Sequence, residues 1–327
     1  MRAVRCLAWG GIDDLVIEDV PVPTLGAGEV RVAIRAAGLN FADTLIIAGK
    51  YQEKPALPFS PGFEAGGVVL EVGGGVTSVK PGDRVMAVLN HGGFAEEAVL
   101  RAEDVFPIPD AMDFVTAAAF PIAYGTSHIA LWERARLKAG EVLLVHGAAG
   151  GVGLTAVEIG KAMGATVIAT AGGAAKLEVA KAHGADHLID YQAEDIRERV
   201  KELTGGRGAD VVYDPVGGDV FDASLRCTAW SGRLLAVGFA AGRVPQVPAN
   251  ILLVKNLAVL GIYWGSYRTH APELVAESFR TLFGWTVEGK LKPHVSHTLP
   301  LAEFKDALRL LAERKSTGKV VLTVAPP

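Results

Sequence analysis

The sequence has very little cysteine and no strong excess of charge of either sign. Only two of its 327 residues are cysteine, which argues against a framework of disulfide bonds and favours a reducing compartment. The formal net charge of -4 indicates no basic surface for nucleic acid or for an anionic membrane. Apolar runs of membrane-spanning length are missing, and the first residues lack the apolar core of a signal peptide. We therefore expect a soluble, cytoplasmic protein.

Length and composition favour a globular chain with more than one domain. Half of the residues are hydrophobic and 21% are charged, which is typical of compact domains. A chain of 327 residues is too long for one ordinary hydrophobic core. The segment Glu29–Arg35 alternates as a half-buried strand does, and glycine and proline recur through the first hundred residues. We predict a β-rich domain over residues 1–120.

From about Pro121 the pattern changes to alternating strands and helices, which predicts an α/β domain with a doubly wound parallel sheet over residues 121–265. The six predicted strands are Val142–Val145, Thr166–Thr170, His187–Ile189, Val211–Asp214, Arg233–Val237 and Leu257–Leu260. A closing segment, residues 266–327, is expected to return to the first domain. It contains a predicted helix over Pro272–Gly289, a helix over Leu301–Arg314 and a final strand over Lys319–Val324. Cofactor and substrate are expected to meet in the cleft between the two domains.

The most informative stretch runs from Val142 to Gly153. Four apolar residues, two of them β-branched, lead into a glycine turn, and a helix of small residues follows. Such a turn lets the backbone approach a dinucleotide pyrophosphate, whose charge faces the free N–H groups at the helix start. We predict that Ala149, Gly150, Gly151 and Val152 bind the cofactor there.

Several motifs occur together in an order that resembles a known family across essentially the whole chain. They are Ala37–Thr44, Pro61–Val69, Val79–Val85, Gly93–Glu96, Ala148–Gly153 and Asp214–Gly218. The chain resembles the medium-chain dehydrogenase/reductase superfamily, and within it the quinone oxidoreductase (zeta-crystallin-like) branch, which uses NADPH and no metal. The resemblance implies a GroES-like catalytic domain and a Rossmann dinucleotide-binding domain. Ala148 stands where the plain glycine pattern has its first glycine.

The resemblance also bears on metal binding. Zinc alcohol dehydrogenases are similar to this chain but place cysteine where Asn40 stands and histidine where Phe63 stands, and neither residue present supplies the ligand that zinc prefers. His294 and His297 have metal-like spacing, but in a strand they point to opposite faces. Glu64 is expected to be a structural hydrogen-bonding residue. We predict no metal site, and hence a conjugated acceptor whose charge needs no Lewis acid.

The cofactor is expected to be NADPH. An NAD-binding sheet usually carries Asp or Glu about 20 residues beyond the glycine turn, whereas Val167–Lys176 contains no acid. The resemblance places Lys176 and Tyr191 at the 2′-phosphate and adds Lys319 as a second charge. Relatives often carry a serine near Gly172 or Gly173, and because both are glycine here we also expect some use of NADH. For the nicotinamide, the resemblance implies contacts with Thr126, Gly238, Phe239, Ile262, Tyr263 and Trp264.

On the substrate side, the resemblance implies Asn40 and Tyr51 as catalytic residues. Tyr51 supplies a phenol that orients or protonates a carbonyl oxygen, and Asn40 an amide donor. Related enzymes often have tyrosine where Leu45 stands, so a proton donor is missing there. Asp43 is expected to be the N-cap of the helix that follows.

The resulting prediction is a metal-free, NADPH-dependent oxidoreductase that transfers hydride to a quinone or an activated enone. An enoyl-thioester reductase and a nucleotide-binding protein with little turnover remain alternatives. The apolar run Ile251–Gly265, at the last strand of the sheet, predicts a homodimer, since relatives pair these edge strands about a twofold axis.

Overall fold

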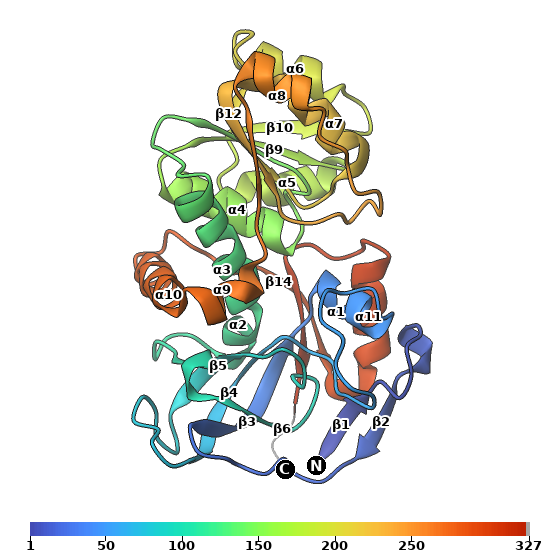
Figure 1. The fold of residues 1–327 in the computed structure, drawn as a ribbon, viewed down its shortest axis with the longest axis vertical. Coiled ribbons are helices and arrows are strands. Elements are labelled where there is room, and N and C mark those ends of the chain that lie inside the picture. The colour runs from blue at the N-terminus through green and yellow to red at the C-terminus, as the bar shows by residue number, and fades with distance from the viewer. Residues whose placement is uncertain (325–327) are drawn as a thin grey trace. The chain divides into compact units, whose positions relative to one another are not determined.

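The computed structural model describes residues 1–324, and their contacts divide the chain into two units. Unit 1 consists of Met1–Ile122 together with the chain from Pro293 onward, and unit 2 is Ala123–Lys292. In Figure 1 the blue and red segments therefore belong to one unit and the green to orange segments to the other.

Unit 1 is built on a seven-stranded sheet with the order β14-β15-β3-β4-β5-β7, in which β6 also pairs with β3. Its strands are β3 (Glu29–Gly38), β4 (Glu64–Val72), β5 (Arg84–Val88), β6 (Glu97–Arg101), β7 (Val105–Pro107), β14 (Val295–Pro300) and β15 (Lys319–Thr323). A separate antiparallel pair joins β1 (Arg2–Arg5) to β2 (Val16–Asp19). Short 3-10 turns cover Ile12–Asp14, Ala102–Asp104 and Leu301–Glu303.

The last strand within residues 1–324 completes this sheet. β15 runs antiparallel to β3, with Val321 opposite Gly38. Helix α11 (Phe304–Ala312) contacts β15 and also α1 (Phe41–Ile47), and the two helices lie together in Figure 1. Helix α2 (Phe114–Ala119) packs on β3 and β4. Because of this pairing, the first residue of β15 comes close to the start of α1.

Unit 2 has a six-stranded sheet in the order β10-β9-β8-β11-β12-β13, and every neighbouring pair is parallel. The strands are β8 (Val142–Val145), β9 (Thr166–Ala171), β10 (His187–Asp190), β11 (Ala209–Asp214), β12 (Thr228–Ala236) and β13 (Ala258–Gly261). The predicted doubly wound parallel sheet and all six of its strands are confirmed.

Helices cover both faces of this sheet. Successive residues of a buried strand point to opposite sides, so each strand contacts helices on both faces. Leu144 of β8 joins a cluster with residues of α6 (Ile196–Leu203) and α7 (Gly218–Cys227). The neighbouring Leu143 instead approaches α4 (Gly151–Ala162) at Gly160. The remaining helices of the unit are α3 (Pro121–Ile129, which begins in unit 1), a π-helical turn (Ala130–Arg134), α5 (Ala174–Ala182), α8 (Ala249–Lys255), α9 (Tyr267–His270) and α10 (Pro272–Val287), with a 3-10 turn over Trp264–Ser266.

Residues 266–292, which the sequence analysis placed in the closing segment, have their contacts in unit 2. Helix α10 buries Phe279 against the ring of Trp264, with a centroid distance of 6.1 Å. The Nδ1 atom of His128 lies 2.9 Å from the hydroxyl of Ser278. These contacts attach α10 to α3 and to the end of the parallel sheet. Within residues 1–324, none of the helices has the length and apolar character required to cross a bilayer.

Candidate active site

The carboxyl edge of the parallel sheet in unit 2 gathers most of the predicted cofactor residues. The chain runs from β8 to β9 and β10 on one side and then returns to β11 on the other side of β8. The turn after β8 consequently lies beside the loop after β11, where Gly147 approaches Pro215 and Val216. In doubly wound sheets such a reversal of strand order opens the crevice that binds dinucleotides.

The glycine turn is held tightly against the sheet. The Ala148 N–H donates to the carbonyl of Thr170 (3.0 Å), and the Gly150 N–H donates to the carbonyl of Gly147 (2.9 Å). Gly150 is the N-cap of α4, whose first turn begins at Gly151. A Cβ on Gly153 would stand 2.1 Å from the Gly147 carbonyl oxygen, so only glycine fits there. Ala149, Gly150, Gly151 and Val152 thus form one helix N-terminus, whose first N–H groups have no helical partner and attract an anion.

The end of the second strand brings two donors together over a glycine. A Cβ on Gly172 would lie 2.8 Å from the hydroxyl oxygen of Tyr191 and 3.0 Å from Nε2 of Gln192. Asp190 holds this loop, because its Oδ1 accepts from the N–H groups of Gly173 (3.2 Å) and Gln192 (3.0 Å). Lys176 follows in the first turn of α5. Gln192 was not among the residues predicted from the sequence, and its position directly after Tyr191 was the only signal for it.

Beneath the glycine turn lies a buried histidine that is structural. His146 Nε2 lies 2.7 Å from the hydroxyl of Ser224, which donates its proton to the Val220 carbonyl. Nε2 is therefore the protonated nitrogen, and Nδ1 accepts from the Thr170 hydroxyl at 2.9 Å. Burial lowers the pKa of His146, so the ring stays neutral and links β8, β9 and α7.

The predicted nicotinamide residues fall into two groups within unit 2. Trp264, only 4% exposed, packs against Gly125, which precedes Thr126 on α3. The N–H of Ile262 donates to the carbonyl of Ala236, and Tyr263 links Ile262 to Trp264. Gly238 and the exposed Phe239 instead follow β12, where Gly238 approaches the Pro215 carbonyl. Thr126 and Trp264 are thus brought together, and Gly238 and Phe239 lie beside the loop after β11.

In unit 1, Asn40 directly precedes α1, and its side chain makes a hydrogen bond from its nitrogen and another to its oxygen. Its Nδ2 donates to Glu64 Oε1 (2.7 Å), and its Oδ1 accepts from Lys319 Nζ (2.7 Å). Asn40 itself is the N-cap of α1. The prediction that Asp43 caps the helix is therefore wrong, because Asp43 is the third residue of α1.

Asp43 instead closes the first turn from inside. It is fully buried, and its Oδ2 accepts from the backbone N–H of Asn40 (2.7 Å) while its Oδ1 accepts from that of Gly62 (3.1 Å). Desolvation by burial raises the pKa of Asp43 to about 7, although these two N–H donors and Lys319 oppose the shift. The carboxyl of Asp43 therefore titrates near neutrality.

Lys319 does not fit its predicted role at a nucleotide phosphate. It is 5% exposed, and its ammonium donates to the Leu39 carbonyl (2.6 Å), to Asn40 Oδ1 (2.7 Å) and to Glu64 Oε1 (2.6 Å). All three of its N–H donors are thereby used inside unit 1, which leaves none for a phosphate. The other oxygen of Glu64 accepts from the Ile122 N–H at the start of α3 (2.8 Å), in keeping with the hydrogen-bonding role expected for Glu64.

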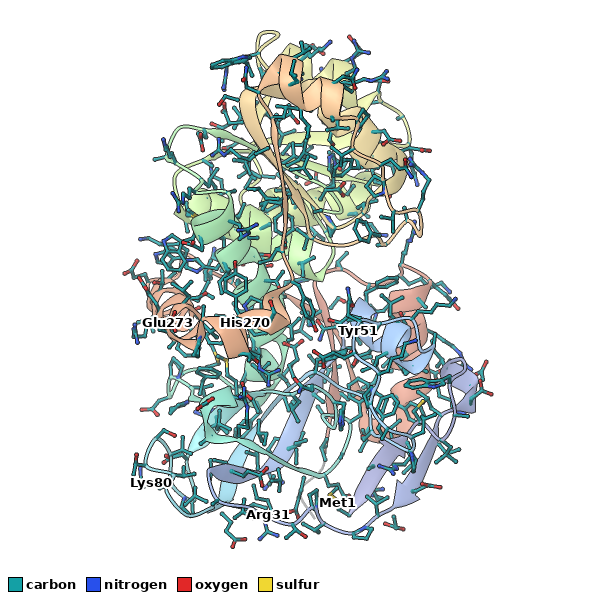
Figure 2. All side chains as sticks on the ribbon, in the orientation of Figure 1. Met1, Arg31, Tyr51, Lys80, His270 and Glu273 are labelled. Carbon is teal, nitrogen blue, oxygen red and sulfur yellow. The ribbon has the colours of Figure 1, made fainter. Side chains whose placement is uncertain are left out.

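Tyr51 follows α1 and lies beside it in Figure 2. Its ring contacts that of Phe63, with a centroid distance of 5.3 Å and an interplanar angle of 55°. Phe63 directly precedes Glu64, so Tyr51 and Asn40 contact neighbouring residues at the start of β4. Tyr51 is half-buried and packs against the core of unit 1.

Comparisons with known proteins agree with this two-unit architecture. Residues 26–110 match the family model described as alcohol dehydrogenase GroES-like domain, and residues 151–280 match that described as zinc-binding dehydrogenase. The chain is 47% identical over 325 residues to a quinone oxidoreductase-like protein 2 homolog of Nematostella vectensis, covering 98% of this chain and 88% of that protein. It is 39% identical to a quinone oxidoreductase of Pseudomonas aeruginosa, covering 98% and 99% of the two chains. A crystal structure of Escherichia coli quinone oxidoreductase complexed with NADPH superimposes with a TM-score of 0.92 at 34% identity, covering 99% of this chain and 100% of that one.

The chain belongs to the medium-chain dehydrogenase/reductase family, in its quinone oxidoreductase-like branch. It is accordingly an enzyme of the oxidoreductase class with a GroES-like domain and a Rossmann-like domain.

Zinc, which one family description names, does not fit the residues present. Position 40 offers an amide and position 63 a phenyl ring, neither of which is a zinc ligand of the usual kind. The carboxylate of Glu64 is already engaged by the Lys319 ammonium, whose positive charge opposes a second cation. His294 and His297 bond to Thr317 and Ser296. Among residues 1–324, histidine, cysteine, aspartate and glutamate form no group of three suited to a metal ion.

Proposed function

We propose that this enzyme is a metal-free, NADPH-dependent reductase that transfers hydride to a quinone or to the double bond of an activated enone. The observation that carries the proposal is the end of β9, where Gly172 lies under the Tyr191 hydroxyl and the Gln192 amide with no acidic residue between Val167 and Lys176. An acid in that segment would repel a 2′-phosphate, whereas these donors and the lysine attract one. The names of the relatives, one of them complexed with NADPH, support it.

Each part of the cofactor has candidate residues in unit 2. The helix N-terminus of Ala149, Gly150, Gly151 and Val152 would hold the pyrophosphate, and Lys176, Tyr191 and Gln192 the 2′-phosphate. Thr126, Gly238, Phe239, Ile262, Tyr263 and Trp264 would hold the nicotinamide. When bound, NADPH supplies the hydride.

The choice of acceptor follows from the chemistry of unit 1. Without zinc ligands, the protein has only hydrogen bonds with which to stabilise negative charge on the acceptor oxygen. A quinone or an enone spreads that charge over a conjugated system, whereas a saturated aldehyde concentrates it on one oxygen. Asn40 and Tyr51 are the donors we assign to that oxygen. Saturated aldehydes and ketones are therefore expected to be poor substrates.

A panel of 1,4-benzoquinone, simple enones, enoyl thioesters and saturated aldehydes, assayed for NADPH consumption, tests the proposal. We expect quinones or enones to be reduced fastest, and activity to survive a chelator in protein that holds less than stoichiometric zinc. Faster turnover of enoyl thioesters would favour the thioester reductase. Absence of turnover with every acceptor would favour a nucleotide-binding protein instead. Equal efficiency with a saturated aldehyde, or a zinc requirement, would refute the proposal.

We further propose that the enzyme is a homodimer. β13 is the last strand in the order of the parallel sheet and pairs with β12 on one side. An edge strand exposes backbone donors and acceptors that a second copy can pair about a twofold axis. Light scattering at micromolar concentration should give the dimer mass, and a monomer mass would contradict this.

A further inference from the structure

Three polar side chains meet at the start of α1 although they lie far apart in the sequence. Asn40 caps the helix, Glu64 begins β4, and Lys319 begins β15. The Lys319 ammonium lies 2.6 Å from Glu64 Oε1 and 2.7 Å from Asn40 Oδ1. The side chains of Lys319 and Glu64 are only 6% and 0% exposed, so this is a fixed internal ion pair.

The charges around Asn40 allow only one orientation of its amide. A lysine ammonium can only donate hydrogen bonds, and an ionised carboxylate can only accept them. The amide oxygen must therefore face Lys319 and the amide nitrogen must face Glu64, as the 2.7 Å distances show. A flipped amide would set donor against donor and acceptor against acceptor, which costs the hydrogen bonds on both sides.

One N–H of Asn40 remains for an external partner. Its Nδ2 carries two hydrogens, and Glu64 Oε1 accepts one of them. Among residues 1–324 the second hydrogen has no acceptor. Asn40 is also half-buried, whereas Glu64 and Lys319 are buried, so Asn40 is the most exposed residue of this cluster.

The ammonium also changes the amide electronically. A cation that donates to an amide oxygen draws electron density from the nitrogen, and linked hydrogen bonds in a low-dielectric interior strengthen one another. The outward N–H of Asn40 is thereby made a stronger donor than that of an ordinary asparagine. Stability alone gives little reason for the ion pair, because buried pairs can often be replaced by apolar residues without loss.

We propose that Lys319 is a positioning residue that orients and polarises the Asn40 amide, so that its outward N–H is donated to the acceptor oxygen that gains charge during hydride transfer. This inference rests on the proposed reductase function. It assigns Lys319 a role in unit 1 in place of the role at the 2′-phosphate that the resemblance implied.

Turnover of quinone reports on the positioning of the Asn40 amide, whereas the binding of NADPH reports on a contact with the nucleotide phosphate. The two measurements therefore separate these roles of Lys319. Lys319→Met should lower kcat with quinone by about tenfold or more, while the Kd of NADPH stays unchanged. Lys319→Arg, which keeps a cation able to donate to Oδ1, should recover part of the loss. Lys305→Met is the matched control, because Lys305 is a half-buried lysine of the same unit whose ammonium donates to the Asp13 carbonyl in an exposed hydrogen bond. Its kinetics should equal those of the wild type.

Removing Lys319 alone leaves the Glu64 charge buried, so a charge-balanced variant guards against misfolding. In Lys319→Met with Glu64→Gln, the new amide oxygen still accepts from Asn40 while the ammonium is gone, and kcat should fall as in Lys319→Met. In an Asn40→Ala background, removal of Lys319 should cause no further loss, because the lysine acts through that amide. The inference would be overturned if removal of Lys319 lowered kcat as strongly in the Asn40→Ala background as in the wild type, or if it weakened the affinity for NADPH.

Absence of turnover with every acceptor would refute the proposed function only. A spectroscopic readout tests the inference even in that case. The side-chain amide signals of Asn40, identified by their loss in Asn40→Ala, should shift in the nitrogen–proton correlation spectrum of the charge-balanced variant. Unchanged signals would show that the ammonium does not polarise the amide and would overturn the inference.

Discussion

The hydroxyl oxygen of Tyr191 lies 2.8 Å from the point where a Cβ on Gly172 would stand. The two residues follow neighbouring parallel strands, β9 and β10, at the same edge of the sheet. The absent side chain of Gly172 thus makes room for a hydroxyl donor that comes from the next strand.

Replacement of Gly172 should therefore change the choice of cofactor. Gly172 has no positive φ, so an aspartate can adopt its backbone conformation, and the exposed Tyr191 ring can move aside. In Gly172→Asp the new carboxylate repels a 2′-phosphate, and we expect NADPH to bind at least about tenfold more weakly while NADH binding is retained. Gly74→Asp, at an open and exposed site of unit 1, is the control for the added charge. Fluorescence titration with both cofactors measures the effect, and parallel losses of both would contradict it.

Replacement of Lys176 should weaken the binding of NADPH but not that of NADH. Charge-assisted hydrogen bonds contribute about 1.5–3 kcal/mol, so Lys176→Ala should weaken NADPH binding about tenfold or more and leave NADH binding nearly unchanged. Lys181→Ala removes an exposed lysine from the last turn of the same helix and should affect neither cofactor. Equal weakening of NADPH and NADH by Lys176→Ala would disprove the assignment.

Tyr51→Phe should separate chemistry from packing. The ring contact with Phe63 survives this change, because only the hydroxyl is removed. We expect a lower kcat with quinone or enone, an unchanged Kd for NADPH and little change in thermal stability. Tyr267→Phe in α9 serves as the control. Wild-type turnover in Tyr51→Phe would leave Asn40 as the sole donor to the acceptor oxygen.

The buried carboxyl of Asp43 should make stability depend on pH in an unusual direction. Its pKa is raised from 3.8 to about 7 on folding, so between these values the folded chain holds a proton that the unfolded chain has lost. The contribution of Asp43 to the free energy of unfolding is fully present below the pKa of the unfolded chain. It falls as the pH rises toward 7, with a slope approaching about 1.4 kcal/mol per pH unit.

Asp43→Asn isolates this contribution. The variant loses one of two backbone hydrogen bonds and should be less stable than the wild type at about pH 5, but the difference should shrink toward about pH 8, where the wild type carries the buried charge. Urea unfolding across that range measures the difference. A gap that does not vary with pH would show that Asp43 is ionised throughout.

Local sequence pattern predicts most of unit 2. Its strands are short apolar runs, its glycine turn is contiguous from Gly147 to Gly153, and parallel strands place their following loops at one edge. The loop residues after β8, β9 and β11 could therefore be assigned to one region from local pattern alone. Local pattern did not decide the start of α1, where Asn40 rather than Asp43 is the N-cap.

The polar cluster of unit 1, in contrast, depends on tertiary packing. Lys319 is separated from Asn40 by 279 residues, and only the antiparallel pairing of β15 with β3 brings its ammonium to that amide. No spacing in the sequence indicates this contact. The resemblance therefore assigned Lys319 to a phosphate, whereas in the structure Lys319 is buried. The same holds for Gln192 over Gly172, which depends on the register of two parallel strands. Burial and register are properties of the packed chain, because each depends on which distant segments fill the space around a residue.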